Sequence, residues 1–587
     1  MKLRKQLMSG NEAIAYGAYL AGVKVAAAYP GTPSTEILEN LARYPGVYAE
    51  WSPNEKVAAD VAAGAAYAGR RALAAMKHVG LNVAAETLFY TSYTGLEAGL
   101  VIVTCDDPAM HSSQNEQDNR HYARFAKVPM LEPADSEEAK QFVRLGFEIS
   151  EAFDTPVLLR STTRLSHSKS IVQLEPEPAP DLPELPPYRR NPEKYVMVPA
   201  HARKRHVVVE ERLRRLAAYF EELPVNRIEW GSSELGIITS GISYQYAREV
   251  FPDASVLKLG TVWPLPAEKI RTFAAAVKKV LVIEELDPFL EEQVRLLGVE
   301  CLGKAVFPVL GEFGPALVRA SARRAGLLPA AEPTGACAVP PVELPARPPM
   351  LCPGCGHRPV FYALQIYGAV VFGDIGCYTL AAAPPLAAVH TTGCMGAGIA
   401  VAHGADKAGL KERRVAVIGD STFFHAGIPA LIDVVYNRGA TTVIVLDNRT
   451  TAMTGHQDHP GTGKTLAGEP TVEVDVGALA RAVGFGRVEV VDPFDFRRLR
   501  AVIKEHLDSS EPSVIIARHP CVLKAREKRP PYRVDPAKCN DCGRCRRIGC
   551  APLVRSGDKM AIDPLLCNGC GFCAQICGHG AIVQAQE

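Results

Sequence analysis

The sequence has little of what marks a membrane protein or a nucleic-acid-binding protein. No run of 18 or more apolar residues occurs in its 587 residues, so no membrane span is predicted. Lysine and arginine total 65 against 64 acidic residues, and a formal net charge of +1 provides no basic surface for a polyanion. The basic start of the chain lacks the apolar core and small-residue cleavage site of a signal peptide. We therefore expect a cytoplasmic, soluble protein with neither nucleic acid nor membrane as a partner.

Cysteine is abundant instead, and its distribution is uneven. Eight of the 16 cysteines lie within the last 49 residues. In a reducing cytoplasm such a group indicates metal ligation rather than disulfides. Two motifs each place three cysteines at steps of three and a fourth soon after; they comprise Cys539, Cys542, Cys545 and Cys550, and Cys567, Cys570, Cys573 and Cys577.

This spacing is typical of a ferredoxin with two [4Fe–4S] clusters, in which the fourth cysteine of each motif ligates the other cluster. We expect Cys539, Cys542, Cys545 and Cys577 to hold one cluster, and Cys567, Cys570, Cys573 and Cys550 to hold the second. Structural zinc is the alternative, but a third cysteine after each CxxC pair suits zinc poorly. Four residues rather than three precede Cys550, and glycine rather than proline follows Cys577.

Alternating apolar and amphipathic segments predict α/β layers over most of the chain. Two proline-rich stretches are typical of extended linkers. We expect an α/β domain over 1–172, a linker with a helix over 173–229, a second α/β domain over 230–328, a proline-rich linker over 329–350, a third α/β domain over 351–527 and the cysteine-rich domain over 528–587.

A carboxylate stands directly after a predicted buried strand in "VAVIGDSTFFHAG", residues 415–427. This is Asp420, and Asn448 follows a second such strand 28 residues later. If the two strands are parallel neighbours, Asp420, the Asn448 side chain and the Thr450 carbonyl could bind Mg²⁺ together with phosphate oxygens. The main chain from Gly419 to Ser421 would face the same phosphates. The spacing is equally compatible with a helix cap at Asp420 and a turn at Asn448.

A glycine-rich turn, "HTTGCMGAGIAVAHG", precedes this motif and suits close approach of a phosphate, with Gly396 and Gly398 as candidates. It is not a Rossmann fingerprint, because no acidic residue follows a second strand at the required distance. The segment "GTGKT" at 461–465 ends like a P-loop, but Asp458 occupies the position of the first glycine. ATP binding there is therefore not expected.

Taken together, "CPGCGH", "GDIGCYTL", "TTGCMGAG", "GDSTFFHAGIPAL" and "LDNRTTAMTGHQ" resemble the 2-oxoacid:ferredoxin oxidoreductases. The resemblance extends to "YPGTPSTEI" near the start and to the ferredoxin tail. It implies an α/β multidomain fold: two parallel-sheet domains of the thiamine diphosphate-binding type, a transketolase C-terminal-like domain and a small two-cluster ferredoxin domain. It also implies thiamine diphosphate and Mg²⁺ as cofactors, with CoA as co-substrate.

The activity implied by the resemblance is oxidative decarboxylation of a 2-oxo acid to an acyl-CoA and CO₂, with electrons passing to a soluble ferredoxin. Arylpyruvates such as indolepyruvate and phenylpyruvate are the implied substrates, and pyruvate is the alternative. A small beta subunit is the implied partner, in a dimer of heterodimers. Two rival functions remain: a non-catalytic electron-transfer subunit with a relic cofactor fold, and a non-oxidative decarboxylase, which would not need the ferredoxin tail.

The resemblance also assigns residues in the first domain. Glu55 matches the glutamate that hydrogen-bonds the aminopyrimidine ring of thiamine diphosphate and so promotes loss of its acidic carbon-bound proton. The sequence pattern by itself favours another role, because Ser52-Pro53-Asn54-Glu55 is a capping box in which Glu55 would reach back to the Ser52 N–H. The match to the family reverses that preference. Thr32, in "YPGTPS", is the candidate hydroxyl near the substrate carboxylate.

Two further groups have weaker signals. His111, Arg120 and His121 lie in a polar stretch that could meet a carboxylate or CoA, or could be a solvated loop. His425, His456 and His459 are expected near the cofactor, as supporting or surface residues rather than catalysts. In several members of the family a further cluster lies beside the cofactor. Its ligands here would be Cys352, Cys355, Cys377 and Cys521; the alternatives are structural thiols or zinc.

Overall fold

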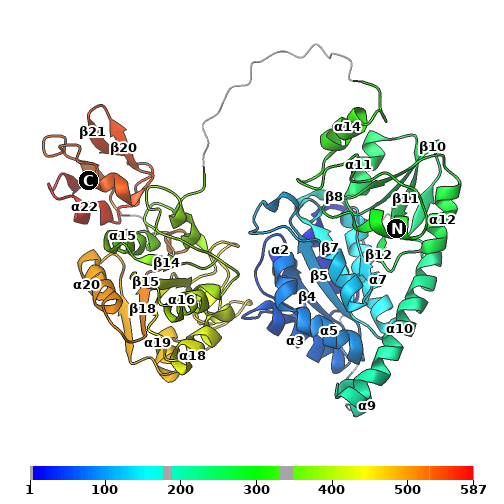
Figure 1. Ribbon diagram of the computed structural model, residues 1–587, viewed down its shortest axis with the longest axis horizontal. Helices are drawn as coiled ribbons and strands as arrows, with labels where there is room; N and C mark the ends of the chain where they lie inside the picture. Colours follow the sequence, from blue (N-terminus) through cyan, green and yellow to red (C-terminus); the bar gives the residue numbers. More distant parts are fainter. Residues whose placement is uncertain are drawn as a thin grey trace. The chain divides into compact units, whose positions relative to one another are not determined.

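The computed structural model describes residues 4–175, 184, 185, 188, 190–330, 348–527 and 529–585. It divides the chain into two compact units, Met1–Pro340 and Pro341–Glu587 (Figure 1). Most of the predicted linker over 329–350, and part of that over 173–229, lie outside the described residues. No helix in the described part of the chain has the length and apolar character needed to cross a bilayer.

A seven-stranded sheet lies at the centre of unit 1, in the order β12-β6-β7-β5-β4-β2-β3. All neighbours are parallel except β12, which is antiparallel to β6. The strands are β2 (Val25–Ala28), β3 (Tyr48–Trp51), β4 (Ala72–Lys77), β5 (Leu100–Asp106), β6 (Met130–Leu131), β7 (Val157–Thr162) and β12 (Thr261–Trp263). Strands β4, β5 and β7 are buried along their whole length, as parallel strands covered on both faces require.

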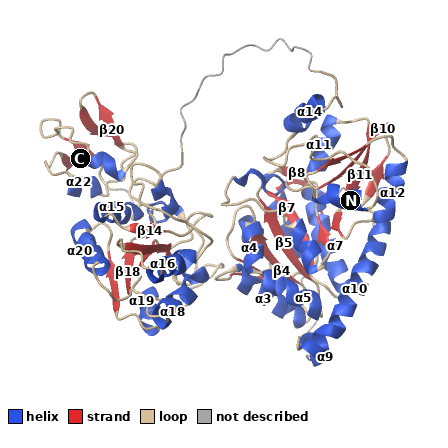
Figure 2. Ribbon diagram, viewed as in Figure 1, coloured by secondary structure: helices blue, strands red, loops and turns tan. Residues whose placement is uncertain are grey.

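Helices surround this sheet (Figure 2). They are α1 (Gly10–Leu20), α2 (Thr35–Leu41), α3 (Glu55–Tyr67), α4 (His78–Val83), α5 (Ala85–Thr94), α6 (Arg120–Ala126), α7 (Ser136–Phe153) and α8 (Thr163–His167). A two-stranded antiparallel sheet joins β1 (Arg4–Ser9) to β8 (Lys169–Leu174). This pair brings the two ends of the first α/β segment together.

A second sheet of unit 1 has the order β13-β10-β11-β9. Its strands are β9 (Arg227–Glu229), β10 (Ser232–Ser240), β11 (Ala254–Leu259) and β13 (Val280–Ile283). The helices of this region are α9 (Pro192–Tyr195), α10 (Pro199–Glu222), α11 (Ser243–Val250), α12 (Ala267–Ala275), α13 (Phe289–Leu296) and α14 (Pro315–Arg324). Strand β12 follows β11 in the chain but joins the first sheet, and one core contains Ile102 together with Leu257 and Phe289. The first two predicted α/β domains therefore share a core.

Unit 2 contains a five-stranded, all-parallel sheet, β14-β15-β16-β18-β17. Its strands are β14 (Val370–Phe372), β15 (Arg414–Gly419), β16 (Thr442–Asp447), β17 (Arg487–Val491) and β18 (Ser513–Arg518). The helices around it are α15 (His357–Tyr367), α16 (Ala397–Lys407), α17 (Asp420–Thr422), α18 (Ile428–Tyr436), α19 (Val476–Ala482), α20 (Phe496–Leu507) and α21 (Val522–Ala525).

The cysteine-rich tail packs against this domain within unit 2. It has two short antiparallel pairs, β19 (Tyr532–Val534) with β22 (Ile582–Gln584), and β20 (Leu553–Ser556) with β21 (Lys559–Ile562). The turns η4 (Arg544–Ile548) and α22 (Phe572–Ile576) carry cysteines of the two motifs. Ile548 and Phe572 belong to the core of the larger domain, so the tail is anchored to it by apolar contacts.

Candidate functional site

The tail cysteines line two separate cavities. Cys539, Cys542, Cys545 and Cys577 line one. Cys550, Cys567, Cys570 and Cys573 line the other. Each cavity thus takes three cysteines from one motif and the fourth from the other, which is the exchange that the spacing predicts.

The separation of the sulfurs bears on the zinc alternative. Within the described part of the chain, no three of these sulfurs lie within 4.8 Å of one another. Tetrahedral zinc, with Zn–S bonds of about 2.3 Å, would require sulfurs about 3.8 Å apart. The two sets are therefore wider than tetrahedral zinc requires. Burial raises the pKa of the Cys573 thiol to about 12, and its cysteine neighbours add to the shift, so thiolates here need a metal partner.

Three acidic side chains gather at one edge of the unit 2 sheet. Asp374 follows β14, Asp420 follows β15 and Asp447 ends β16. Because the three strands are parallel neighbours, their carboxyl ends meet at this edge. The repulsion between Asp420 and Asp447 contributes, after burial, to a raised pKa of Asp447. This edge concentrates hard oxygen ligands of the kind that Mg²⁺ prefers.

Asp420 is 3% exposed and its carboxylate is surrounded by donors. Oδ1 accepts the N–H of Ser421 at 2.9 Å, and Oδ2 accepts the N–H of Arg449 at 2.7 Å and Nε2–H of His459 at 3.1 Å. Nδ1 of His459 accepts the N–H of Gly461, so the ring carries its proton on Nε2. Burial alone would raise the pKa of Asp420, but these donors outweigh it and lower the pKa. The carboxylate is therefore charged and oriented.

The other predicted diphosphate residues lie beside it. Asn448 begins the loop after β16, and its Oδ1 accepts the N–H of Thr450 at 3.2 Å. Thr450 is 2% exposed. Ser421 Oγ accepts the hydroxyl of Thr451 at 2.8 Å. Gly419 ends β15, where a Cβ would lie 2.8 Å from the Tyr378 ring.

The N–H groups of Gly396 and Gly398 have a partner within the protein. Their N–H groups donate to Asp374 Oδ1 and Oδ2, each at 2.9 Å. Glycine is required by packing instead: a Cβ would lie 2.5 Å from Ala426 at position 396 and 2.9 Å from the Gly373 carbonyl at position 398. Close approach of a phosphate to this glycine-rich turn stays a prediction. Asp374, which the sequence analysis does not single out, accepts both N–H groups. The signal available for it was its place in "GDIGC", two residues after the strand β14.

Cys352, Cys355, Cys377 and Cys521 come together near the same edge. Burial raises the pKa of Cys377 to about 11, and the nearby Cys521 and Cys352 add to the shift. Burial likewise raises the pKa of Cys355 to about 12, with Cys352 and Cys377 contributing. The N–H of Cys521 donates to the Asn448 carbonyl at 2.9 Å. This set of four thus adjoins the loop that carries the predicted magnesium ligands.

Glu55 lies at an edge of the unit 1 sheet, as the first residue of α3. It is 5% exposed. Gly80 packs directly on its side chain, since a Cβ at position 80 would lie 2.7 Å from Glu55 Cγ. The helix is capped by Asn54, whose side chain accepts the N–H of Val57 at 2.9 Å. The capping box from Ser52 is absent, because Ser52 Oγ donates to Glu50. Helix capping therefore does not explain a buried glutamate at this position.

Thr32 and a missed lysine lie at the carboxyl ends of neighbouring strands. Thr32 follows β2 in a partly exposed loop. The adjacent Gly31 packs closely on Lys77, since a Cβ at position 31 would lie 3.0 Å from the Lys77 Cβ. Lys77 ends β4, is 8% exposed, and donates to the Ser112 carbonyl at 2.5 Å. Burial lowers the pKa of Lys77 to about 8, against the opposing effect of Asp107. The signal for it was a lysine at the end of a buried apolar run.

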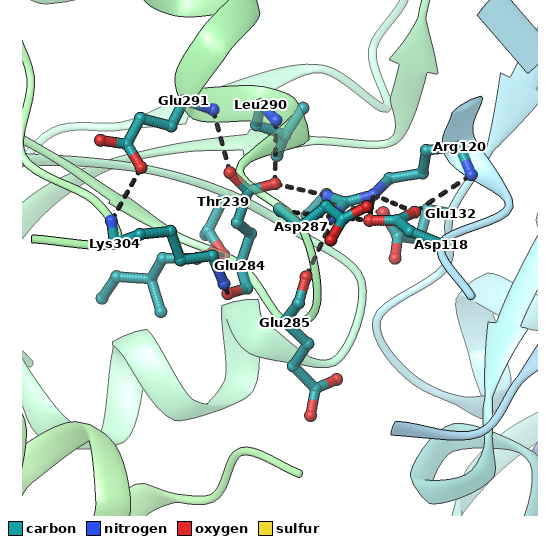
Figure 3. Close-up of polar contacts among 12 residues, drawn as sticks. Asp118, Arg120, Glu132, Thr239, Glu284, Glu285, Asp287, Leu290, Glu291 and Lys304 are labelled. Atoms are coloured by element: carbon teal, nitrogen blue, oxygen red, sulfur yellow. Dashed lines mark hydrogen bonds and ion pairs between the residues drawn. The ribbon is translucent and has the colours of Figure 1, made fainter. Parts of the chain in front are cut away.

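Arg120 is neither a ligand site nor part of a solvated loop. It is 1% exposed, and its guanidinium donates to Asp118, to Glu284 at 2.6 Å and to the Glu285 carbonyl at 2.9 Å (Figure 3). His121 Nε2 lies 3.0 Å from Asp287. Every guanidinium nitrogen of Arg120 has a partner, so the prediction that Arg120 meets a substrate is not supported.

Comparison with known families agrees with this arrangement. A model described as the thiamine diphosphate-binding part of pyruvate flavodoxin/ferredoxin oxidoreductase matches residues 16–220. A model described as the C-terminal thiamine pyrophosphate-binding domain of thiamine pyrophosphate enzymes matches residues 374–517, and a 4Fe–4S binding domain matches residues 560–583. The fold, the two sheet edges and the cysteine sets thus define a thiamine diphosphate-dependent, iron–sulfur oxidoreductase that acts on 2-oxo acids.

Full-length relatives narrow the family. Indolepyruvate oxidoreductase subunit IorA of Archaeoglobus fulgidus is 43% identical over 99% of this chain and 98% of its own length. The subunit of the same name from Methanothermobacter thermautotrophicus is 42% identical, with 98% and 97% covered. This chain belongs to the family of these IorA large subunits. A solved 2-oxoglutarate:ferredoxin oxidoreductase from Magnetococcus marinus aligns over 55% of this chain and 65% of its own, with 19% identity and a TM-score of 0.46.

Proposed function

We propose that this chain, as a large catalytic subunit, oxidatively decarboxylates arylpyruvates with CoA, giving an arylacetyl-CoA, CO₂ and two electrons for a soluble ferredoxin. The observation that carries the substrate class is the near full-length similarity to subunits named for indolepyruvate. A small beta subunit and a dimer of heterodimers complete the proposed assembly. The domain boundaries predicted from the sequence belong to the same proposal.

The residues on the two sheet edges suit separate parts of the cofactor. Asp420, Asn448 and the Thr450 carbonyl would hold Mg²⁺ and, through it, the diphosphate. The main chain from Gly419 to Ser421 would face the phosphates. Glu55 would hydrogen-bond the aminopyrimidine ring. When bound, thiamine diphosphate supplies the carbon nucleophile for the 2-oxo group. Thr32 is proposed to contact the substrate carboxylate.

Replacing Asp420 by asparagine should weaken Mg²⁺-dependent binding of thiamine diphosphate by at least about tenfold, since even supporting residues of metal sites contribute 10- to 100-fold. Equilibrium dialysis at several Mg²⁺ concentrations measures the effect. Asp433→Asn, at a position that is 51% exposed on α18, is the control. Unchanged affinity in D420N would leave Asp420 with a purely structural role beside His459.

The set formed by Cys352, Cys355, Cys377 and Cys521 is proposed to hold a third [4Fe–4S] cluster. Cys377→Ser should then lower the iron content by about four atoms per chain, with the signals of the two tail clusters retained. Cys394→Ser, which changes an exposed cysteine outside the set, should leave iron content unchanged. Equal iron in the wild type and C377S would mean that these thiols are structural.

The proposed activity is tested with the chain co-expressed anaerobically with its small partner. Reduction of a dye is followed with indolepyruvate, phenylpyruvate or pyruvate, each with and without CoA. CoA-dependent reduction that favours the arylpyruvates is the expected result. Preference for pyruvate would replace the substrate class, and reduction without a CoA requirement would point to a different fate of the acyl group. No reduction by a sample with intact clusters would favour a non-catalytic electron carrier.

A further inference from the structure

Arg358 lies between two groups of cysteines in unit 2. It is the second residue of α15, directly after the "CPGCGH" segment, and is 3% exposed. Nη1 donates to the carbonyls of Ile548 at 2.7 Å and Gly549 at 2.6 Å, the two residues before Cys550. Nη2 donates to the carbonyls of Leu351 and of Cys352, the latter at 3.3 Å. One side chain therefore joins the loop of Cys352 to the loop of Cys550.

The same side chain forms part of the wall of the cavity that the second tail set lines. Arg358 lines this cavity together with Cys355 and the four cysteines Cys550, Cys567, Cys570 and Cys573. The two loops approach each other closely, since a Cβ at Gly354 would lie 1.8 Å from the Asn568 side chain. Gly354 also lines this cavity, beside Cys550. The contact between the larger domain and the tail is therefore direct at this cavity.

The charge of Arg358 has no acidic partner among the described residues, although it is buried beside an apolar core that includes Ile548 and Phe572. Its Nε–H is buried and likewise has no partner within the described residues. A buried charge and a buried donor are costly when uncompensated. A [4Fe–4S] core held by four thiolates is an anion whose sulfurs accept hydrogen bonds, and it would supply both missing partners.

We propose that Arg358 is a redox-tuning residue, the counter-charge of the cluster held by Cys550, Cys567, Cys570 and Cys573. Reduction adds one electron, and hence one negative charge, to this anion. A fixed guanidinium in a low-dielectric wall favours that added charge, as do N–H donors directed at cluster sulfurs. Arg358 thus raises the electron affinity of the cluster that lies nearest to the larger domain, which favours transfer of electrons out of that domain.

The test is a redox titration of the intact, iron-loaded chain followed by electron paramagnetic resonance. Cys570→Ala first identifies the signal of this cluster, because it removes one of its ligands. Arg358→Gln is then expected to lower the equilibrium constant for one-electron reduction of this cluster about tenfold. This corresponds to a fall of about 59 mV in its reduction potential. Arg358→Lys keeps the charge, so its equilibrium constant for reduction of this cluster should stay within about threefold of the wild-type value. Arg555→Gln, which removes an arginine of the same tail with a 55% exposed side chain, should have no effect.

Several outcomes would overturn the inference. An unchanged potential in R358Q with full iron content excludes tuning, as does a shift in R358K as large as that in R358Q. If R358Q loses this cluster, Arg358→Met takes its place; loss in both neutral variants means that the arginine only holds the two loops together. The inference rests on the cysteine assignment proposed above. If C570A removes no single signal, that assignment fails, and the inference fails with it.

Discussion

Replacing Glu55 by glutamine is expected to lower turnover of the 2-oxo acid by about 10²- to 10⁴-fold, the usual contribution of a residue that promotes proton transfer. Glutamine matches the shape of the 5% exposed side chain and can still hydrogen-bond. It cannot carry the negative charge that favours the reactive ring tautomer. Initial rates of CoA-dependent dye reduction measure the effect, with bound thiamine diphosphate quantified in the same samples.

The matched control is Glu86→Gln. Glu86 stands in the first turn of α5 as Glu55 does in α3, but its side chain is exposed. E86Q should retain wild-type rates. If E55Q bound the cofactor normally and turned over at the wild-type rate, Glu55 would be only the first residue of its helix. If E55Q lost the cofactor altogether, its role would be in binding rather than in proton transfer.

The sequence predicted best those features that depend on short-range spacing. The eight tail cysteines lie within two compact motifs, and the geometry of a cubic cluster restricts how such motifs can share ligands. The structure places the fourth cysteine of each motif with the other three as expected. Parallel strands ending at Asp420 and Asn448 were likewise predictable, because each residue directly follows a buried apolar run.

The sequence predicted poorly the features that depend on partners far along the chain. The glycine-rich turn gives no sign that the N–H groups of Gly396 and Gly398 donate to Asp374, 22 and 24 residues earlier. The segment after Asp420 continues as a π-helix over Phe423–Gly427, which no periodicity in the sequence indicates. Strand β12 joins the sheet of the first domain although it follows β11 in the chain.

Arg120 shows most clearly that partners far along the chain cannot be predicted from the local sequence. Its surroundings in the sequence are polar, which favours a solvated loop, but Glu284, 164 residues further along, pairs with it in the interior. The network of buried charges continues through Arg160, which pairs with Glu132 and whose Nε lies 2.7 Å from Asp106. Figure 3 shows the part of this network around Arg120. It lies where the first two α/β segments share a core, so its charge balance affects the stability of unit 1.

Two adjacent glutamates in this network should respond oppositely to the same substitution. The Glu284 carboxylate accepts Arg120 Nη1–H at 2.6 Å and the N–H groups of Leu290 and Glu291, each at 2.9 Å. Glutamine there would turn an amide donor toward other donors and leave Arg120 without its charge partner. Breaking a buried pair in this way costs about 3–5 kcal/mol. E284Q should therefore be destabilised at both acid and neutral pH.

Glu285 is different, because its carboxylate points away from Arg120 (Figure 3). Its partner among the described residues is the N–H of Phe313, at 2.7 Å. Burial raises the pKa of Glu285 to about 7 from an ordinary value of 4.5, against the opposing effects of Phe313 and Arg160. The folded state therefore binds a proton between pH 4.5 and 7 that the unfolded state has released. The stability that this group contributes is complete below pH 4.5 and is lost as the pH rises through 7.

Glu285→Gln should remove this dependence, because the amide is neutral at every pH. We expect E285Q to match the wild type near pH 4 and to be more stable by up to about 3 kcal/mol at pH 8, because the pKa of Glu285 is about 7 in the folded protein against 4.5 in the unfolded chain, at 1.36 kcal/mol for each pH unit between them. Denaturant unfolding of the full chain between pH 4 and 8.5 measures the difference. Glu268→Gln, at a 75% exposed position on α12, should keep the wild-type slope. Parallel pH profiles for E285Q and the wild type would show that Glu285 is ionised in the folded protein, so that the network tolerates a further buried negative charge.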